Sequence, residues 1–297
     1  MTRDLSATSP ASPSADDAPV KPSGLRATAR LLRSELWLIA SRRRNLIGLA
    51  VLCAIPAILA VAMLANNAAG SDKGTPPFMM DLYGNGFFVL LGALGLETMV
   101  FFPLAVAVLA ADAISGEAQT GTLRYLLVAP VGRTKLLFVK FVAASTAVIV
   151  MVTAIAAVGA GVGLSLFGTG DLVTLSGMPI PFEESVVRLC WVCLYVMAIL
   201  IALLAFALFV STLTDQPMAG TIGTVGFVVV CQILSGVPQL NWLHPYLITT
   251  FLRSWGDLIR MPARTGAVES GLILAAGYTA FFLALAWARF TSKDVTS

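Results

Sequence analysis

Long apolar segments follow one another along most of the chain after residue 44, and shorter polar stretches separate them. Each apolar segment is close to or above the roughly 20 residues that a helix needs to cross a hydrocarbon core of about 30 Å. The third is longer than a bilayer requires, so we expect it to tilt or to project from the membrane. The pattern predicts six spans, at Asn45–Ala65, Phe87–Ala111, Leu136–Phe167, Val186–Val210, Met218–Val237 and Ser270–Ala288.

The composition is typical of a membrane protein. Apolar residues make up 58% of the chain and charged residues 12%, whereas soluble domains carry about 25% charged residues. The net charge of +3 is small, and the lysines and arginines follow the predicted topology instead of gathering in one patch. We therefore expect an all-α polytopic membrane protein that contacts membrane lipid and has no nucleic-acid partner.

The chain before the first span falls into two parts. Residues 1–22 are rich in Ser, Ala, Pro and Asp, which predicts a disordered tail. Residues 23–44 have a helical period, with an apolar stripe beside a second stripe that holds Arg26, Arg30 and Arg33. Because long basic side chains can reach the headgroups while apolar ones enter the acyl boundary, this segment predicts an amphipathic interfacial helix. The alternative is a solvated helix in a soluble extension.

The distribution of lysine and arginine sets the expected orientation. With the N-terminus in the cytoplasm, 14 of these residues fall on the cytoplasmic side and 5 on the opposite side. Cytoplasmic loops are enriched in them, so both termini are expected to be cytoplasmic. Residues 112–135, between the second and third spans, then form a cytoplasmic loop.

This loop places charges, glycines and a proline between two apolar spans. Within it, the stretch "TLRYLLVA" from Thr122 predicts a short helix with Thr120 or Thr122 as its N-cap and with Pro130 and Gly132 at its end. The leucines of that stretch give the helix an apolar face. A short helix at the membrane surface offers a partner protein a rigid contact.

The run from Ala111 to Lys140, "ADAISGEAQTGTLRYLLVAPVGRTKLLFVK", resembles the cytoplasmic loop of ABC-2 type ABC transporter permeases. Their pattern is a Gly-Glu pair, Gly-Thr-Leu, a short apolar helix, a proline, a basic residue and a later lysine. The sequence departs from that pattern at neutral Ala118 and Gln119, where family members often have charged residues. The resemblance implies an ATPase-coupling role for Gly116, Glu117, Gly121, Thr122, Leu123, Arg124, Leu126, Leu127, Pro130 and Arg133.

The resemblance also implies a role and partners. The interfacial helix corresponds to the elbow helix of such permeases, and the loop helix to the coupling helix that docks on a separate ATPase. The sequence has no GxxxxGK[ST] motif, so this chain is not expected to be an enzyme or to bind a cofactor, and ATP and Mg are expected in the ATPase. Two ATPase copies and a second permease subunit, identical or related, would complete an exporter of the cell membrane. Its pathway suits a lipid, a peptide or a hydrophobic drug.

Two other classes of function remain open. An ion-coupled secondary transporter needs ionisable residues near the middle of the membrane, and Glu97 and the rim residue Arg188 are the candidates for that role. A non-transporting membrane scaffold needs no polar cavity. Because a carboxylate deep in a span costs roughly 2.5 kcal/mol or more, Glu97 is expected to face the protein interior or an aqueous cavity. It either bonds a neighbouring helix or lines a pathway.

The glycines and cysteines of the spans indicate contacts between helices, and a further segment does not span. Gly159 and Gly163 form a GxxxG spacing, which indicates a close helix contact, including one at a dimer seam. Cys190 and Cys193 have CxxC spacing inside a span, where core packing is expected, and no metal site is predicted with His244 as the single histidine. Residues 239–269 are too interrupted to span, and their aromatic and basic side chains predict an external interfacial or re-entrant segment.

Overall fold

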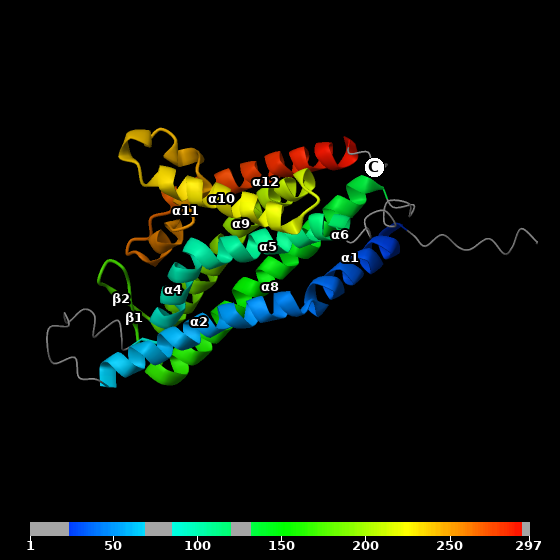
Figure 1. Cartoon of the computed structure of the whole chain (residues 1–297). Helices are drawn as coiled ribbons and strands as arrows, with labels where there is room; N and C mark the ends of the chain where they lie inside the picture. Colours follow the sequence, from blue (N-terminus) through cyan, green and yellow to red (C-terminus); the bar gives the residue numbers. More distant parts are fainter. Residues whose placement is uncertain (1–23, 69–84, 120–131, 293–297) are drawn as a thin grey trace, which may run out of the picture.

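The computed structural model describes residues 24–68, 85–119 and 132–292, and the predicted N-terminal tail and the predicted helix from Thr122 lie outside them. Long helices dominate the described part of the chain (Figure 1). In chain order they are α1 (Gly24–Ser41), α2 (Arg43–Ala68), α4 (Phe87–Leu96), the π-helical turn η2 (Glu97–Phe101), α5 (Phe102–Ala113), α6 (Ser115–Gln119), α8 (Arg133–Phe167), α9 (Phe182–Leu213), α10 (Pro217–Ser235) and α12 (Gly266–Ser292).

Six helical segments of the described chain are long and apolar enough to cross a membrane. They confirm the six predicted spans, and the protein is a multi-pass membrane protein of helical architecture. The main differences lie at the ends, where several helices extend a few residues into the flanking polar sequence. The segments are Arg43–Ala65, Phe87–Ala113, Arg133–Phe167, Phe182–Leu213, Pro217–Ser235 and Gly266–Ser292.

The helix α1 is distinct from the first span. The two helices are separated at Arg42, and the side-chain amide of Asn45 donates to the Ile39 carbonyl across the break, over 3.0 Å. α1 packs against α8, and Leu31 contacts the core. Trp37 lies on the other side of the helix, 74% exposed. A separate amphipathic helix therefore precedes the first span, and its place at a membrane interface remains a prediction.

The helix α9 forms the centre of the bundle. It contacts α5, α8, α10 and α12, and a larger share of it is buried than of any other span in the described chain. A helix that is apolar on all sides suits such a position, because each face meets another helix. Phe206 on α9 stacks on Phe227 of α10, with ring centroids 4.0 Å apart, and meets Phe282 of α12 edge-on at 4.9 Å. The core is therefore organised around α9.

The GxxxG pair brings α8 into backbone contact with the start of the second span. A side chain added at Gly163 would lie 2.0 Å from the carbonyl oxygen of Gly86, and one added at Gly159 would lie 3.2 Å from Leu90. Small residues permit such an approach. The close contact is therefore made within the chain, and both glycines are buried in it.

The second span contains a π-helical turn at Glu97–Phe101. Pro103 follows it in the first turn of α5. A proline has no backbone N–H, so it removes the usual donor to the carbonyl four residues earlier, that of Met99. The amide of Gln232 on α10 donates to this Met99 oxygen over 2.6 Å. The irregular turn is thus tied to the fifth span.

A short β-hairpin is an addition to the predicted all-helical pattern. β1 (Leu172–Val173) pairs with antiparallel β2 (Pro179–Ile180), and Gly177 adopts a positive φ of 78° in the turn between them. Leu172 and Ile180 are buried. Two residues in each strand are too few to leave a periodic signal in the sequence.

Up to Thr265 the predicted external segment contains only short elements, and its last four residues belong to the start of α12. The short elements are the 3₁₀ turns η3 (Pro238–Leu240), η4 (His244–Tyr246) and η5 (Ser254–Ile259) and the one-turn helix α11 (Ile248–Phe251). The Leu175 N–H in the turn of the hairpin donates to the Ile259 carbonyl over 3.3 Å. The Tyr195 hydroxyl on α9 donates to the Phe251 carbonyl over 2.8 Å. The segment is therefore fastened to the bundle by hydrogen bonds.

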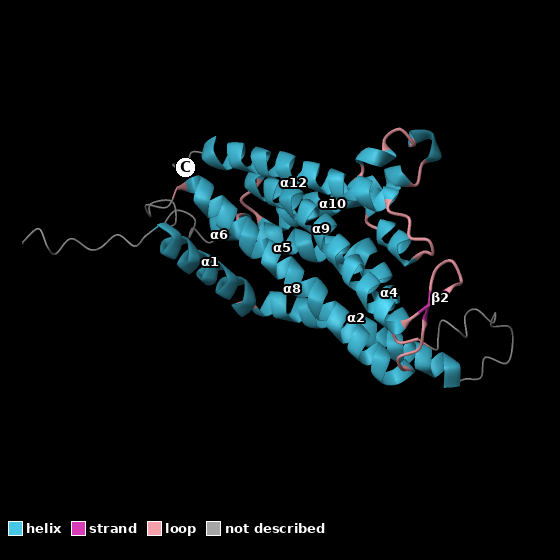
Figure 2. Ribbon diagram, turned by 180° about the vertical axis from the view of Figure 1, so that it is seen from behind, coloured by secondary structure: helices cyan, strands magenta, loops and turns pink. Residues whose placement is uncertain are grey.

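The two ends of the bundle differ in content. The start of α1, the helix α6 and the C-terminal end of α12 lie together at one end, whereas the β-hairpin and α11 lie at the other (Figure 1). The view from behind shows the same separation (Figure 2). We call these the loop end and the hairpin end. The residues of the predicted coupling loop that the structure describes lie at the loop end.

The glycine contact yields a stability prediction. Gly163→Ala places a methyl group against the Gly86 backbone, which must shift, and we expect it to destabilise the protein by about 1–3 kcal/mol. Gly161→Ala, on the same helix, meets nothing within 4 Å and should be neutral or slightly stabilising, because alanine favours the helix. Thermal unfolding of both variants in detergent tests this. Equal melting temperatures would contradict the contact.

Candidate functional site

The structure describes three of the ten predicted coupling residues. Gly116 and Glu117 lie in α6, and Arg133 begins α8. The other seven lie outside the described residues; they are Gly121, Thr122, Leu123, Arg124, Leu126, Leu127 and Pro130. The structure therefore shows the two places where the loop joins the bundle.

At the first of these, a buried lysine links three helices. Lys140 of α8 is 1% exposed. Its ammonium lies 2.6 Å from Oε1 of Glu117 on α6, and 3.1 and 3.2 Å from the two carboxylate oxygens of Glu35 on α1. Both glutamates are also buried. One cation thus holds α1 and α6 to the third span.

Asp112 makes a second set of ion pairs nearby. It lies at the end of α5, 6% exposed, and its carboxylate is 3.1 Å from a guanidinium nitrogen of Arg42. Arg44 also pairs with it. The residues around the α1–α2 break are therefore joined to the end of the second span at Asp112, five residues before Glu117.

A pair of serines fixes the start of α6 against α9. The hydroxyl oxygens of Ser115 and Ser211 are 2.7 Å apart, and the Ser115 N–H donates to the Ser211 hydroxyl over 3.1 Å. The Ser115 hydroxyl also lies 3.0 Å from the Ser211 carbonyl oxygen. Both residues are fully buried. Serine is small enough to make these bonds where two helices meet.

The far end of the loop is attached to α12. The guanidinium of Arg133 donates to the Thr291 carbonyl over 2.9 Å, and the Trp287 indole donates to the Thr134 hydroxyl over 2.9 Å. The chain thus leaves the second span and enters the third through two fixed points. Through these contacts, a displacement of the loop between the two points would also displace α1, α8, α9 and α12.

We call Glu35, Arg42, Asp112, Glu117 and Lys140 the loop-end cluster. Burial raises the pKa of the Glu117 carboxyl above its ordinary value, although the adjacent Lys140 acts in the opposite direction. Buried charges of this kind are costly unless they are paired and hydrogen-bonded. The cluster therefore specifies one relative position of α1, α6 and α8.

The sequence predicts a role for Glu117 but not for most of the other residues of the cluster. Lys140 enters only as a part of the loop pattern, and Glu35 and Asp112 are not among the predicted site residues. A signal was present, since Lys140 stands alone in the apolar stretch "LLFVKFVAA" and Glu35 adjoins the apolar stripe of its helix. An isolated charge in an apolar run usually has a partner of opposite charge, but the sequence does not identify the partner residue.

Glu97 lies apart from this cluster. It begins the π-helical turn, is 0% exposed, and its two carboxylate oxygens have no hydrogen-bond partner among the described residues. The next two residues, Thr98 and Met99, line a cavity towards the hairpin end, but Glu97 itself does not. The structural bond to another helix that sequence reasoning considered is therefore not formed within the described chain.

The other candidate, the rim residue Arg188, forms an ion pair with Glu184. Its guanidinium lies 2.6 Å from the Glu184 carboxylate and donates to the Arg260 carbonyl over 2.8 Å. The residue thus joins α9 to the external segment. Among the described residues, no three His, Cys, Asp or Glu side chains gather as a metal site would require, and the four cysteines are unbridged.

The cluster predicts a large effect at Lys140. Lys140→Met removes the cation between two buried carboxylates, which should cost about 3 kcal/mol. Adding Glu35→Gln and Glu117→Gln should recover part of the loss, because no unpaired charge then remains. Arg43→Met, at an exposed site near the same end, is the control and should change stability by less than about 0.5 kcal/mol. Thermal melting of the purified variants measures all three, and a Lys140→Met variant with wild-type stability would refute the cluster's role.

Comparison with known proteins gives a family and no activity. The family whose model matches is described as a protein of unknown function, DUF2705, and the match covers residues 57–296. A search of curated proteins finds no match. The matched part contains Asp112, Glu117 and Lys140, whereas α1 with Glu35 precedes it. Because the match covers most of the chain, the protein belongs to the DUF2705 family.

Proposed function

We propose that the protein is the permease subunit of an ATP-binding cassette transporter, and that its loop at residues 112–135 receives force from a separate ATPase. The observation that carries the proposal is the attachment of this loop. Within the described residues, buried ion pairs and hydrogen bonds fix its start to α1, α8 and α9, and its end to α12. The resemblance of the same loop to ABC-2 type permeases supports it independently.

The attachment suits a coupling element. A partner that moves a loop transmits motion only if the loop is stiffly joined to the helices that must move. Here Glu117 in α6 precedes the predicted docking helix in the sequence, and Arg133 at the start of α8 follows it. Through Lys140 and Glu35, the load also reaches α1. The amphipathic helix and the third span are then expected to move together.

The proposal includes an orientation and a set of partners. The excess of lysine and arginine at the loop end favours a cytoplasmic location for the loop and both termini. The chain acts in the cell membrane with a second permease subunit, identical or related, and two ATPase copies. ATP and Mg are bound by the ATPase, and the pair of permeases forms an export pathway.

One observation favours a second candidate, an ion-coupled secondary transporter. Glu97 is buried in the second span as the first residue of the π-helical turn, and its carboxylate has no hydrogen-bond partner among the described residues. Buried carboxylates with these properties can carry a proton or an ion through a membrane protein. A transporter of this kind would work without an ATPase.

Co-purification and ATPase activity test the first candidate. The tagged protein, extracted from its native membrane with a mild detergent, should bring with it a protein that contains a GxxxxGK[ST] motif and hydrolyses ATP. Leu126→Asp puts a charge on the predicted apolar docking face and should lower the recovered ATPase at least about tenfold. Thr265→Asp adds the same charge at an exposed site of the hairpin end and should leave recovery unchanged. Failure of the wild type to recover an ATPase would favour the secondary transporter.

Thiol labelling tests the orientation. In a variant that lacks Cys53, Cys190, Cys193 and Cys231, cysteine is placed at exposed Gln119 of α6 or at exposed Arg264 near the start of α12. An impermeant maleimide should label Arg264→Cys in intact cells and Gln119→Cys only after the membrane is opened. The reverse pattern would show that the loop faces outward, away from any cytoplasmic ATPase.

A further inference from the structure

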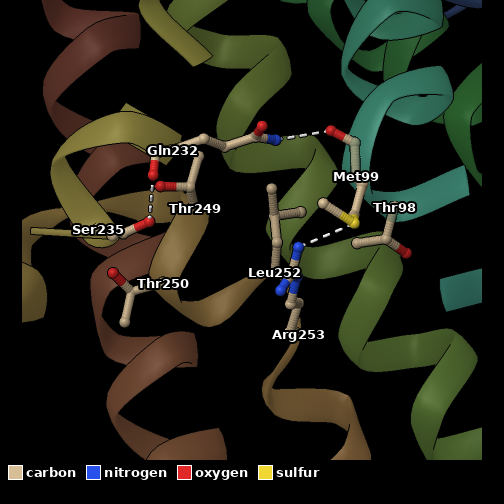
Figure 3. A pocket seen from close by; sticks show the side chains of 9 residues that line it. Thr98, Met99, Gln232, Ser235, Thr249, Thr250, Leu252 and Arg253 are labelled. Atoms are coloured by element: carbon tan, nitrogen blue, oxygen red, sulfur yellow. Dashed lines mark hydrogen bonds between the residues drawn. The ribbon is translucent and has the colours of Figure 1, made fainter. Parts of the chain in front are cut away.

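A cavity of about 430 Å³ lies at the hairpin end, between the second span, the end of α10 and the external segment. Thr98 and Met99 of the π-helical turn form one side of its wall. Gln232 and Ser235 of α10, Thr249 of α11 and Arg253 form much of the rest (Figure 3). Its volume is within the range of about 300–1,000 Å³ that is usual for small-molecule sites. The external segment with α11, which forms part of its wall, lies at the hairpin end, and α6 lies at the loop end (Figure 1).

The electrostatic character of this cavity is positive. Arg253 has no carboxylate partner among the described residues, and no acidic side chain is on the cavity wall. Its guanidinium contacts the sulfur of Met99 over 2.8 Å, and a thioether is only a weak acceptor. By contrast, Arg188 and Arg260 at the same end each pair with a carboxylate. Most of the donors of Arg253 are therefore available to an anion.

The wall also holds unused hydrogen-bonding groups. Thr249 is 7% exposed, and its buried hydroxyl has no hydrogen-bond partner among the described residues; the hydroxyl of Thr250 is buried in the same way. An unsatisfied buried hydroxyl costs about 1–3 kcal/mol. Rotation about χ1 offers a threonine other staggered positions, so a ligand oxygen in the cavity could satisfy these groups. This is a second reason, independent of Arg253, to expect a polar ligand.

The surface around the cavity is apolar. Val100, which follows Met99, is 58% exposed, and Ile233, which follows Gln232, is 62% exposed. Val229, one turn before Ile233, is also exposed. These side chains lie on helices that cross the membrane. A ligand that combines an anionic group with a hydrocarbon chain can therefore place the anion beside Arg253 and the chain along η2 and α10.

We propose that this cavity binds the phosphate-bearing anionic headgroup of an amphiphile. The guanidinium of Arg253 pairs with the phosphate, since its planar donors match the oxygens of that group. Thr249 supplies a hydroxyl on the opposite wall. The proposal does not depend on an ATPase partner, because the site is formed entirely by this chain.

Binding of short-chain lipids to the purified protein tests the proposal. In a neutral detergent, dioctanoyl phosphatidylglycerol should raise the melting temperature in a saturable manner, and dioctanoyl phosphatidylcholine should do so more weakly. Arg253→Gln should reduce the apparent affinity for phosphatidylglycerol at least about tenfold, because it removes a charge-assisted bond. Arg260→Gln, which neutralises an arginine of the same segment paired with Asp257, should bind like the wild type.

Three further measurements separate binding at Arg253 from lost folding, from binding of a free phosphate ester and from binding at α1. Arg253→Lys keeps the charge but not the planar fork, so an intermediate affinity is expected, which also distinguishes lost binding from lost folding. Stabilisation by glycerol phosphate that depends on Arg253 would support the anion site and identify a free phosphate ester as a sufficient ligand. The proposal is overturned if neither phosphatidylglycerol nor glycerol phosphate stabilises the wild type, or if Arg253→Gln binds phosphatidylglycerol as well as the wild type does. It is also overturned if the double variant Arg30→Gln with Arg33→Gln, on α1, loses binding while Arg253→Gln keeps it.

Discussion

The ammonium group of Lys140 is buried in the bundle and requires counter-charges within reach, and the arrangement of the loop end follows from this. Glu35 and Glu117, which lie 105 residues and 23 residues from it in the chain, supply them. A buried cation without partners would cost several kcal/mol. The separate helix α1 and the short helix α6 are thus held to the third span by a single side chain. The ion pairs of Asp112 and the contact between Ser115 and Ser211 extend the same attachment to α2 and α9.

The hairpin end is held together by different contacts. Two backbones approach closely there, and one backbone carbonyl, which has no backbone donor, accepts from a side chain. Gly163 and Gly86 let α8 and the second span touch. Farther along that span, Pro103 withholds a donor from the Met99 carbonyl, and Gln232 replaces it. Irregular helical turns of this kind often accompany functional sites. Here the turn carries Glu97 on its buried side and contributes Thr98 and Met99 to the cavity with Arg253. The two ends thus have separate polar sites, joined by the long helices of the bundle.

The spans could be predicted from the sequence because their length and polarity are local properties, and the lone charge of Lys140 was visible in its apolar surroundings. Its partners could not be predicted, since a pairing with Glu35 across 105 residues leaves no periodic pattern. Gly159 and Gly163 indicated a close contact but not that its partner is the second span of the same chain. Pro103 in "FFPLAV" is a local signal for an irregular turn, because a proline inside a span removes a backbone donor. The role of the loop between Gly121 and Pro130 stays a prediction, because those residues lie outside the described structure.

The central claim is that a cytoplasmic ATPase contacts the loop end. The most direct measurement is site-specific photocrosslinking in native membranes, with a photoreactive amino acid at exposed Gln119, the last residue of α6, and at exposed Thr265 of the hairpin end as the control. The account predicts that position 119 captures a protein with a GxxxxGK[ST] motif and that position 265 does not. Capture of no such protein from position 119, or equal capture from both positions, would contradict the account.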